Sequence, residues 1–344
     1  MRDTLINLGK IFREEQDFIN SSKEIQGAFV LWKNSWPLAE IKNPWFTQEF
    51  IELSVRNWGQ ALHEDAVVKW LENEPKADKP VTVALILAGN LPMVGLHDIL
   101  SCLGAGHNVL VKPSTDDTEL ISNVLALLIV LNPELKDRIK IASGKLENFD
   151  AVIATGSNNS NRYFESYFSN YPHLFRGNRT SLAVLTGEES KEELELLADD
   201  VFQFFGLGCR SVSKLMVPEG FDPNRLLEAF RKYEHLANHN KFHNNYLYHK
   251  SIFGLNMDKF HDFGIIMLRK VPELHAKLSC LNYEEYSDMK AVEKLIELNR
   301  DEIQCVSRKH VSKDYEVKLG DTQKPQLWDY ADGINTMEFL SKLS

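Results

Sequence analysis

Residues 81–92 read VTVALILAGNLP, and this stretch decides the fold. Its first eight residues form an almost wholly apolar run of strand length, which is typical of a parallel strand buried on both faces. Gly89, Asn90 and Pro92 are turn-forming residues and end the run. The stretch therefore predicts a central strand of a parallel sheet with a tight turn at its carboxyl end.

The segments after this strand alternate between short strands and helices. The expected strands are 108–111, 139–142 and 151–154, and the expected helices end at 103 or span 116–131 and 157–169. This alternation predicts parallel strands joined by crossover helices. A second α/β region begins with a strand at 181–185 and continues with a helix at 191–205, a strand at 214–217 and a helix at 223–233.

The two ends of the chain have a different pattern. Residues 1–75 predict helices, with turn signals at Trp36-Pro37 and Asn43-Pro44. Residues 75–80 (PKADKP) are charged and flanked by prolines, which indicates a linker. The tail, residues 319–343, begins as a loop and ends as a short helix.

Composition narrows the class of protein. The 344 residues are enough for two domains, and a formal net charge of -10 argues against general binding to nucleic acids or anionic membranes. The longest apolar run, residues 124–131, is too short to cross a bilayer, and residues 1–10 lack a cleavable signal pattern. The four cysteines form no C-x-x-C pair. We therefore expect a cytoplasmic protein with free thiols and no membrane insertion.

Cys209 is the cysteine best placed for chemistry. It follows Gly206-Leu207-Gly208 directly after a predicted helix, so the backbone can turn sharply and present the thiol in a cleft. Cys102, Cys280 and Cys305 lie in apolar stretches or strands, where burial makes a thiol inert. A cytosolic cysteine is usually a packed apolar residue, so it is the context that marks Cys209 as a candidate nucleophile.

Three short motifs follow predicted strands, at the strand ends where open parallel sheets bind ligands. Asn90 in Gly89-Asn90-Leu91-Pro92 could donate to a developing oxyanion, or the motif is a plain turn. Lys112-Pro113-Ser114 could bind ribose or phosphate, or its lysine is an ordinary solvated one. Thr155-Gly156-Ser157 opens a helix whose amides attract phosphate, but no G-x-G-x-x-G is present. The residues alone leave both interpretations open.

His235, His239 and His243 are spaced by four residues. On one helix they would share a face and could bind a metal. No H-E-x-x-H accompanies them, and their neighbours are Asn and Lys, so we interpret them as a polar surface and predict no metal site.

The order of these motifs resembles the aldehyde dehydrogenase superfamily over residues 80–220. The closer similarity is to the long-chain acyl-CoA reductase family, the LuxC-like fatty-acid reductases. It is carried by AGNLPMVGLHD at 88–98, VLVKPS at 109–114, FGLGCRSVSK at 205–214 and QKPQLWDYADGINTMEFL at 323–340.

The resemblance implies a role for each matching residue. Cys209 stands where the family has its nucleophile, and Asn90 stands where an asparagine completes the oxyanion hole with the nucleophile's own N–H. The resemblance places Lys112 and Ser114 at the adenosine ribose, Gly156 and Ser157 near the cofactor diphosphate, and, through a poor match, Pro272-Glu273-Leu274 at the nicotinamide ribose.

Two departures from the superfamily pattern bear on the reaction. Aldehyde-oxidising members carry E-L-G-G-K before the catalytic domain, and its glutamate activates the hydrolytic water; this chain has Phe175-Arg176-Gly177-Asn178-Arg179. A thioester reductase needs no such base. NAD-preferring relatives often place a glutamate after K-P-S, and here the neutral Thr115 permits NADPH, whereas Asp116 and Asp117 keep NADH possible.

The resemblance implies an α/β fold of two domains. A Rossmann-like cofactor domain with a helical N-terminal part is expected at residues 1–180 and 313–344, and an α/β catalytic domain carrying Cys209 at residues 181–312. The expected reaction is NADPH-dependent reduction of a fatty acyl-CoA thioester to the aldehyde through an acyl-Cys209 intermediate.

Three alternatives stay open. The chain could reduce an acyl phosphate, oxidise an aldehyde, or serve as a non-catalytic scaffold subunit of an acyl-processing complex. The acyl donor could be a carrier protein instead of coenzyme A. A second copy of the chain or an acyl-activating subunit are the partners considered, and the sequence predicts no acyl chain length.

Overall fold

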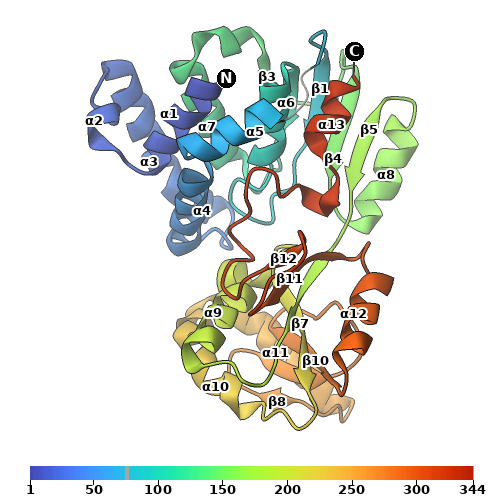
Figure 1. The fold of residues 1–344 in the computed structure, drawn as a ribbon. Coiled ribbons are helices and arrows are strands. Elements are labelled where there is room, and N and C mark those ends of the chain that lie inside the picture. The colour runs from blue at the N-terminus through green and yellow to red at the C-terminus, as the bar shows by residue number, and fades with distance from the viewer. Residues whose placement is uncertain (74–76, 344) are drawn as a thin grey trace. The chain divides into compact units, whose positions relative to one another are not determined.

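A computed structural model describes residues 1–73 and 77–343 of the chain (Figure 1). The chain forms two compact units. Unit 1 contains Met1–Asn178 and Pro325–Ser344, and unit 2 contains Arg179–Lys324. Of the linker expected at 75–80, residues 75 and 76 lie outside the described residues.

Unit 1 begins with the predicted helices, which the structure confirms: α1 (Arg2–Phe12), α2 (Gln16–Ile19), α3 (Lys23–Lys42), α4 (Gln48–Ala61) and α5 (Glu64–Asn73). Ser22 caps α3 by accepting a hydrogen bond from the Ile25 amide at 3.1 Å. The turn expected at Trp36-Pro37 is wrong, because α3 continues through Pro37 and ends at Lys42. Burial of Trp32 and Trp36 in the core outweighs the local cost of the proline.

A parallel sheet forms the centre of unit 1. Its strand order is β3-β2-β1-β4-β5. The strands are β1 (Thr82–Ile86), β2 (Asn108–Lys112), β3 (Ile139–Ile141), β4 (Ala151–Thr155) and β5 (His173–Arg176), and all their pairings are parallel. The intervening helices are α6 (Leu96–Ala105), α7 (Thr118–Leu131), the 3₁₀ helix η1 (Pro133–Asp137) and α8 (Asn158–Phe168). The alternation predicted from sequence is confirmed, whereas β5 was not predicted.

The two faces of this sheet have separate cores. Val83 and Leu85 of β1 join the large cluster formed with the N-terminal helices, α6 and α7. Ala84 points the other way, into a smaller cluster that includes Val152 and Ala154 of β4. On that face α8 packs against β4 and β5 (Figure 1). Burial on both faces explains why β1 is a continuous apolar run.

The tail returns to unit 1 through the 3₁₀ helix η4 (Ala331–Gly333) and α13 (Thr336–Ser341), which packs on α6 (Figure 1). A buried ion pair fixes this contact. Arg176 Nη1 donates to both carboxylate oxygens of Asp98 at 2.6 Å, and Nη2 donates to Thr336 Oγ1 at 2.7 Å. Arg176 stands in the segment where oxidising relatives carry their glutamate motif, and here it joins β5, α6 and α13.

Unit 2 is also built on a mainly parallel sheet, in the order β12-β11-β6-β7-β10-β9-β8. Only the pairing of β8 with β9 is antiparallel among the described strands. The strands are β6 (Thr180–Val184), β7 (Val212–Pro218), β8 (His261–Asp262), β9 (Met267–Lys270), β10 (Cys280–Tyr286), β11 (Ile303–Arg308) and β12 (Glu316–Val317). The helices are α9 (Lys191–Phe202), η2 (Gln203–Gly206), α10 (Asn224–Phe230), η3 (Arg231–Asn238), α11 (Asn240–Leu255) and α12 (Met289–Leu298).

Residues 313–324, which the sequence analysis assigned to the cofactor domain, cluster with unit 2. The reason is a buried carboxylate on α9. Asp200 accepts hydrogen bonds from the Gly320 amide at 2.8 Å, the Thr322 amide at 3.0 Å and the Ser307 hydroxyl at 2.7 Å. These bonds hold the first part of the tail against α9 and β11.

None of the described helices is long and apolar enough to span a membrane.

The buried ion pair gives a stability prediction. Arg176→Ala leaves the Asp98 carboxylate buried without its cation, and we expect a loss of about 3–5 kcal/mol in the free energy of unfolding. Lys191→Ala breaks the exposed pair with Glu228 and should leave the free energy of unfolding close to the wild-type value. Urea unfolding of both variants measures the difference. Equal losses would mean that the Arg176 pair does not hold α13 in place.

Candidate functional site

The structure brings the five unit 1 candidates to one edge of the sheet. Strands β2, β1 and β4 are neighbours, and Ile86 at the end of β1 is paired with both Lys112 and Ala154. Asn90, Ser114 and the Gly156-Ser157 pair follow these strand ends directly. Because the strands are parallel, all five residues lie at the carboxyl edge, where β1 separates the two halves of the sheet and ligands bind in such folds.

Close packing joins two of these strand ends. A Cβ atom on Gly89 would lie 2.4 Å from Ser114 Oγ and 2.6 Å from Ser114 Cβ. The turn after β1 therefore packs its backbone directly on the Ser114 side chain, and only glycine permits this approach.

Two hydrogen bonds to the backbone hold the turn that carries Asn90. The Met93 amide donates to Asp117 Oδ2 at 2.8 Å, and the Ser54 hydroxyl donates to the Pro92 carbonyl at 2.8 Å. Met93 has a φ of 58°, in the left-handed region, which the Asp117 bond helps to hold. Asn90 itself is exposed. Asp117 is thus a positioning residue, a role that the sequence did not predict.

The remaining groups at this edge are suited to phosphate and ribose. Lys112 is exposed, and its ammonium makes no hydrogen bond or ion pair with the residues that the structure describes. Ser157 caps α8, a helix of 11 residues, by accepting a hydrogen bond from the Ser160 amide at 3.2 Å. A free ammonium, the Ser114 hydroxyl and the start of a helix form a donor set that fits the ribose and phosphates of a dinucleotide.

Cys209 belongs to unit 2 and differs from the other cysteines in exposure. It is half-buried, whereas Cys102, Cys280 and Cys305 are buried. Burial raises the pKa of the Cys102 thiol well above its usual range and that of Cys280 to about 12. These two thiols are therefore neutral near pH 7 and poor nucleophiles. The contrast in burial supports Cys209 as the reactive cysteine.

A left-handed segment leads into Cys209. Phe204, Phe205 and Gly206 have φ values of 55°, 57° and 72°, so three consecutive residues after the end of α9 at Phe202 adopt the left-handed conformation. For the two phenylalanines this conformation costs about 1–2 kcal/mol each. The two residues are 7% and 2% exposed, and this burial offsets the strain. Non-glycine residues in this region are concentrated at functional sites.

Hydrogen bonds hold the Cys209 turn itself. Ser181 Oγ on β6 donates to the Cys209 carbonyl at 3.0 Å and accepts from the Cys305 amide at 3.2 Å. Within the turn, the Ser211 amide donates to the Gly208 carbonyl at 3.0 Å. The backbone of the candidate nucleophile is thus tied to β6 and, through Ser181, to β11.

The tail adds a second clamp on the same turn. Arg210 Nε donates to the Thr322 carbonyl at 2.6 Å, and Gln323 Nε2 donates to Ser211 Oγ at 3.1 Å. Thr322 is in turn held by the buried Asp200. The Cys209 turn therefore depends on a carboxylate of α9 that is nine residues earlier in the sequence and acts through the tail.

The segment with Glu273, the poorest match to the family, is also clamped. Lys214 of β7 is fully buried, and its ammonium donates to the Pro272 carbonyl at 2.5 Å and to Glu284 Oε2 at 2.7 Å. Asn282 Nδ2 donates to the Glu273 carbonyl at 3.0 Å. The backbone is held from β7 and β10, while the Glu273 side chain is exposed. A lysine within the apolar strand around residues 212–217 was the sequence signal for this contact, because a buried ammonium requires acceptors.

The three spaced histidines do not share a helix face. His235 lies in η3, His239 is the N-cap of α11 and accepts from the Phe242 amide at 3.2 Å, and His243 lies within α11. Among residues 1–73 and 77–343, no group of three or more His, Cys, Asp or Glu side chains could hold a metal ion.

Asp117 gives a pH-dependent prediction. Burial raises the pKa of this carboxyl well above its usual range, although the Met93 amide lowers it. The folded state therefore binds the proton more tightly than the unfolded state, and wild-type stability falls as pH rises from about 4, the unfolded pKa, through the folded pKa. Asp117→Asn keeps an acceptor for Met93 and removes this loss.

We expect Asp117→Asn to be more stable relative to wild type at pH 8 than at pH 5 in urea unfolding. Asp117→Ala, which also loses the acceptor, should be less stable than Asp117→Asn at both pH values. Parallel pH profiles for wild type and Asp117→Asn would contradict the account.

Comparisons with known proteins agree with this architecture. A family model described as acyl-CoA reductase (LuxC) matches residues 62–239, more than half of the chain. The search of curated protein sequences found no match to this chain.

Solved structures of two aldehyde dehydrogenases and of an NADP-dependent enzyme share the fold. The aldehyde dehydrogenase KauB from Pseudomonas aeruginosa has a TM-score of 0.61 and 13% identity, over 91% of this chain and 72% of that chain. An indole-3-acetaldehyde dehydrogenase solved with NAD+ has a TM-score of 0.59 and 13% identity, over 89% and 71%. An NADP-dependent enzyme from E. coli has a TM-score of 0.60 and 12% identity, over 90% and 73%.

The expected family and the two-domain aldehyde dehydrogenase fold are confirmed by these matches. The chain belongs to the acyl-CoA reductase (LuxC) family and is an oxidoreductase; it shares the fold of aldehyde dehydrogenases.

Proposed function

We propose that the protein reduces a fatty acyl-CoA thioester to the aldehyde, with Cys209 as the nucleophile and NADPH as the hydride donor. The observation that carries the proposal is the Cys209 turn, in which a half-buried thiol sits on a backbone fixed by Ser181 and Arg210. A nucleophile needs this combination of access and fixed geometry.

In the first step, the Cys209 thiolate attacks the thioester carbonyl. A bond forms between the Cys209 sulfur and the acyl carbon, the bond from that carbon to the coenzyme A sulfur breaks, and coenzyme A leaves as a thiolate. The Asn90 amide and the Cys209 N–H are proposed to hold the oxyanion, and a donor in this role is typically worth about 3–4 kcal/mol. The Asp117 and Ser54 contacts fix the turn that presents Asn90.

A nicotinamide cofactor would supply the hydride that converts the bound acyl group to aldehyde and frees the Cys209 sulfur. Lys112 and Ser114 are proposed to hold its adenosine ribose, Gly156 and Ser157 its diphosphate, and Glu273 its nicotinamide ribose. Two of the similar structures are named for NAD+ or NADP, which supports a nicotinamide cofactor here.

The segment around Arg176 favours reduction over oxidation. A hydrolytic route requires a carboxylate to activate water, and this segment instead supplies Arg176 to the buried pair with Asp98. A thioester reductase needs no such base because its leaving group is a thiolate. An acyl-carrier donor, an acyl phosphate donor and a scaffold role are the competing proposals. Higher turnover with an acyl phosphate than with acyl-CoA would favour the acyl phosphate donor. Absence of cofactor binding would favour the scaffold role.

The nucleophile is tested by substitution. Cys209→Ala should lower NADPH-dependent aldehyde formation from a fatty acyl-CoA by about 10³-fold or more, because no acyl-enzyme can form. NADPH binding, measured by titration calorimetry, should stay within about twofold of wild type. Cys102→Ala, at a buried cysteine in α6, is the matched control and should keep activity. Loss of activity in both variants, or in neither, would remove Cys209 from the proposed role.

Cofactor preference is tested at Thr115, which is exposed and therefore tolerant of substitution. Thr115→Glu places a carboxylate beside the expected position of the ribose 2′-phosphate. We expect it to weaken NADPH binding by about tenfold, near 1.4 kcal/mol, and to change NADH binding by less than about twofold. Thr115→Gln is the neutral control. Equal effects of Thr115→Glu on the two cofactors would contradict the assignment of NADPH.

A further inference from the structure

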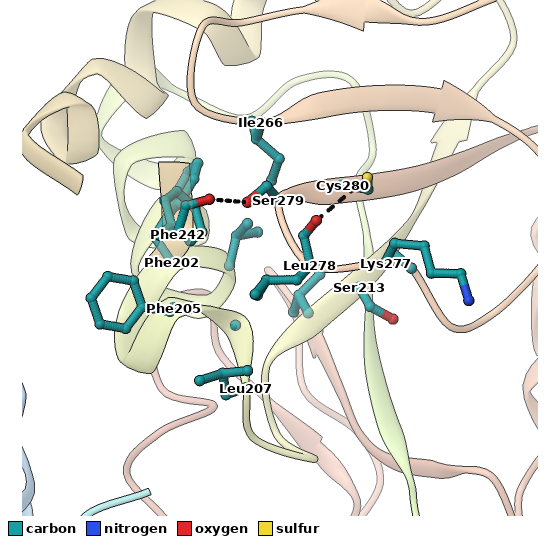
Figure 2. Close-up of a pocket in the computed structure, with 14 residues that line it drawn as sticks. Phe202, Phe205, Leu207, Ser213, Phe242, Ile266, Lys277, Leu278, Ser279 and Cys280 are labelled. Carbon is teal, nitrogen blue, oxygen red and sulfur yellow. Dashed lines mark hydrogen bonds between the residues drawn. The ribbon is translucent and has the colours of Figure 1, made fainter. Parts of the chain in front are cut away.

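A cavity in unit 2 lies beside the Cys209 turn. Gly206 and Leu207, which precede the turn, and Val212 and Ser213, which follow it, all contribute to the wall. The opposite wall is formed by Ile266 and residues 276–280 (Figure 2). The backbone on both sides of the candidate nucleophile therefore borders the same space.

The wall of this cavity is largely apolar and aromatic. Phe202 and Phe205 come from α9 and η2, Phe242 from α11, and Ile266 and Leu278 from the facing segments (Figure 2). The left-handed segment before Cys209 places Phe205 in this wall, so the strained backbone forms part of the cavity as well as the turn.

The polar side chains of the wall make hydrogen bonds within the protein, are uncharged, or extend away from the cavity. Ser213 Oγ donates to the Leu274 carbonyl at 2.7 Å, and Ser279 Oγ donates to the Phe242 carbonyl at 3.3 Å. Burial raises the pKa of Cys280 to about 12, so its thiol is uncharged. Lys277 is exposed, and Figure 2 shows its ammonium extending away from the aromatic side chains. The cavity thus lacks a buried charge among the described residues and fits an aliphatic ligand.

The volume sets a length for that ligand. The cavity measures about 210 Å³. An apolar cavity of about 150 Å³ holds benzene, with six carbons, so by the same ratio this one holds about eight carbons.

We propose that this cavity binds the unbranched aliphatic tail of the acyl substrate and sets a preference for medium-length chains, with about eight carbons beyond the reacting end. The assignment to the substrate tail rests on the proposed function. Residues 205, 266, 276 and 278 then determine chain length, since they line the space.

The test uses the whole protein and separates binding from chemistry. Isothermal titration with straight 1-alkanols of 4–14 carbons measures the cavity without any reaction. Affinity should rise about fourfold for each added methylene up to about eight carbons, and then level off. Continued strengthening up to fourteen carbons, or no dependence on length, would overturn the proposal.

Two substitutions should shift, in opposite directions, the alkanol length at which affinity stops rising (the break). Ala276→Leu adds three carbons to the wall, and should shift the break to about five carbons and weaken 1-octanol binding by up to about 60-fold. Leu278→Ala removes three carbons and should shift the break to about eleven. Ala237→Leu and Leu295→Ala make the same changes at half-buried positions outside the cavity and should leave the wild-type profile unchanged. Profiles for Ala276→Leu and Leu278→Ala that match these controls would overturn the assignment.

Turnover with a saturated acyl-CoA series and NADPH provides the second arm. A break in kcat/KM near the same length, shifted by the same variants, supports both proposals. If aldehyde forms but its dependence on acyl chain length is the same in Ala276→Leu and wild type, the cavity is not the tail site. The reductase assignment then stands. An alkanol break without any acyl-CoA reduction would overturn the reductase assignment, and with it the substrate tail as the occupant.

Discussion

The three consecutive left-handed residues at 204–206 are the constraint on which the site in unit 2 depends. They stop α9 and turn the chain so that Cys209 follows on a separate, hydrogen-bonded turn before β7. The same conformation buries Phe204 and Phe205, and burial of the rings offsets the backbone cost. One local distortion therefore connects the candidate nucleophile to the apolar cavity beside it.

Buried titratable side chains hold the backbone of these functional segments in place. Asp200 organises the tail that anchors Arg210, Lys214 fixes the backbone near Glu273, and Asp117 fixes the turn near Asn90. Each makes hydrogen bonds to main-chain groups of a loop, which gives the loop one preferred conformation at a cost in desolvation. None is proposed to touch the reacting atoms. In this chain, the residues proposed to carry the chemistry are exposed or half-buried, whereas Asp117, Asp200 and Lys214 are buried.

The sequence predicted what depends on local pattern. The apolar run at 81–88 and the glycines around Leu207 indicated a buried parallel strand and a turn before a cysteine, and β1 and the exposure of Cys209 agree. It did not predict β5, whose four residues lack a long apolar run, or the passage of α3 through Pro37, which the burial of Trp36 stabilises. The roles of Asp117, Asp200 and Lys214 depend on partners distant in the chain. In a single sequence such residues resemble ordinary surface charges, and only their apolar surroundings hint at burial.

The central claim, that Cys209 carries the acyl group, is most directly tested by mass spectrometry of the intact protein. After incubation with octanoyl-CoA without cofactor, the account predicts a gain of one acyl group, located by peptide mapping on Cys209, that disappears on addition of NADPH as one equivalent of octanal is released. An unmodified Cys209, an acyl group on another residue, or an adduct that NADPH does not discharge would contradict the account.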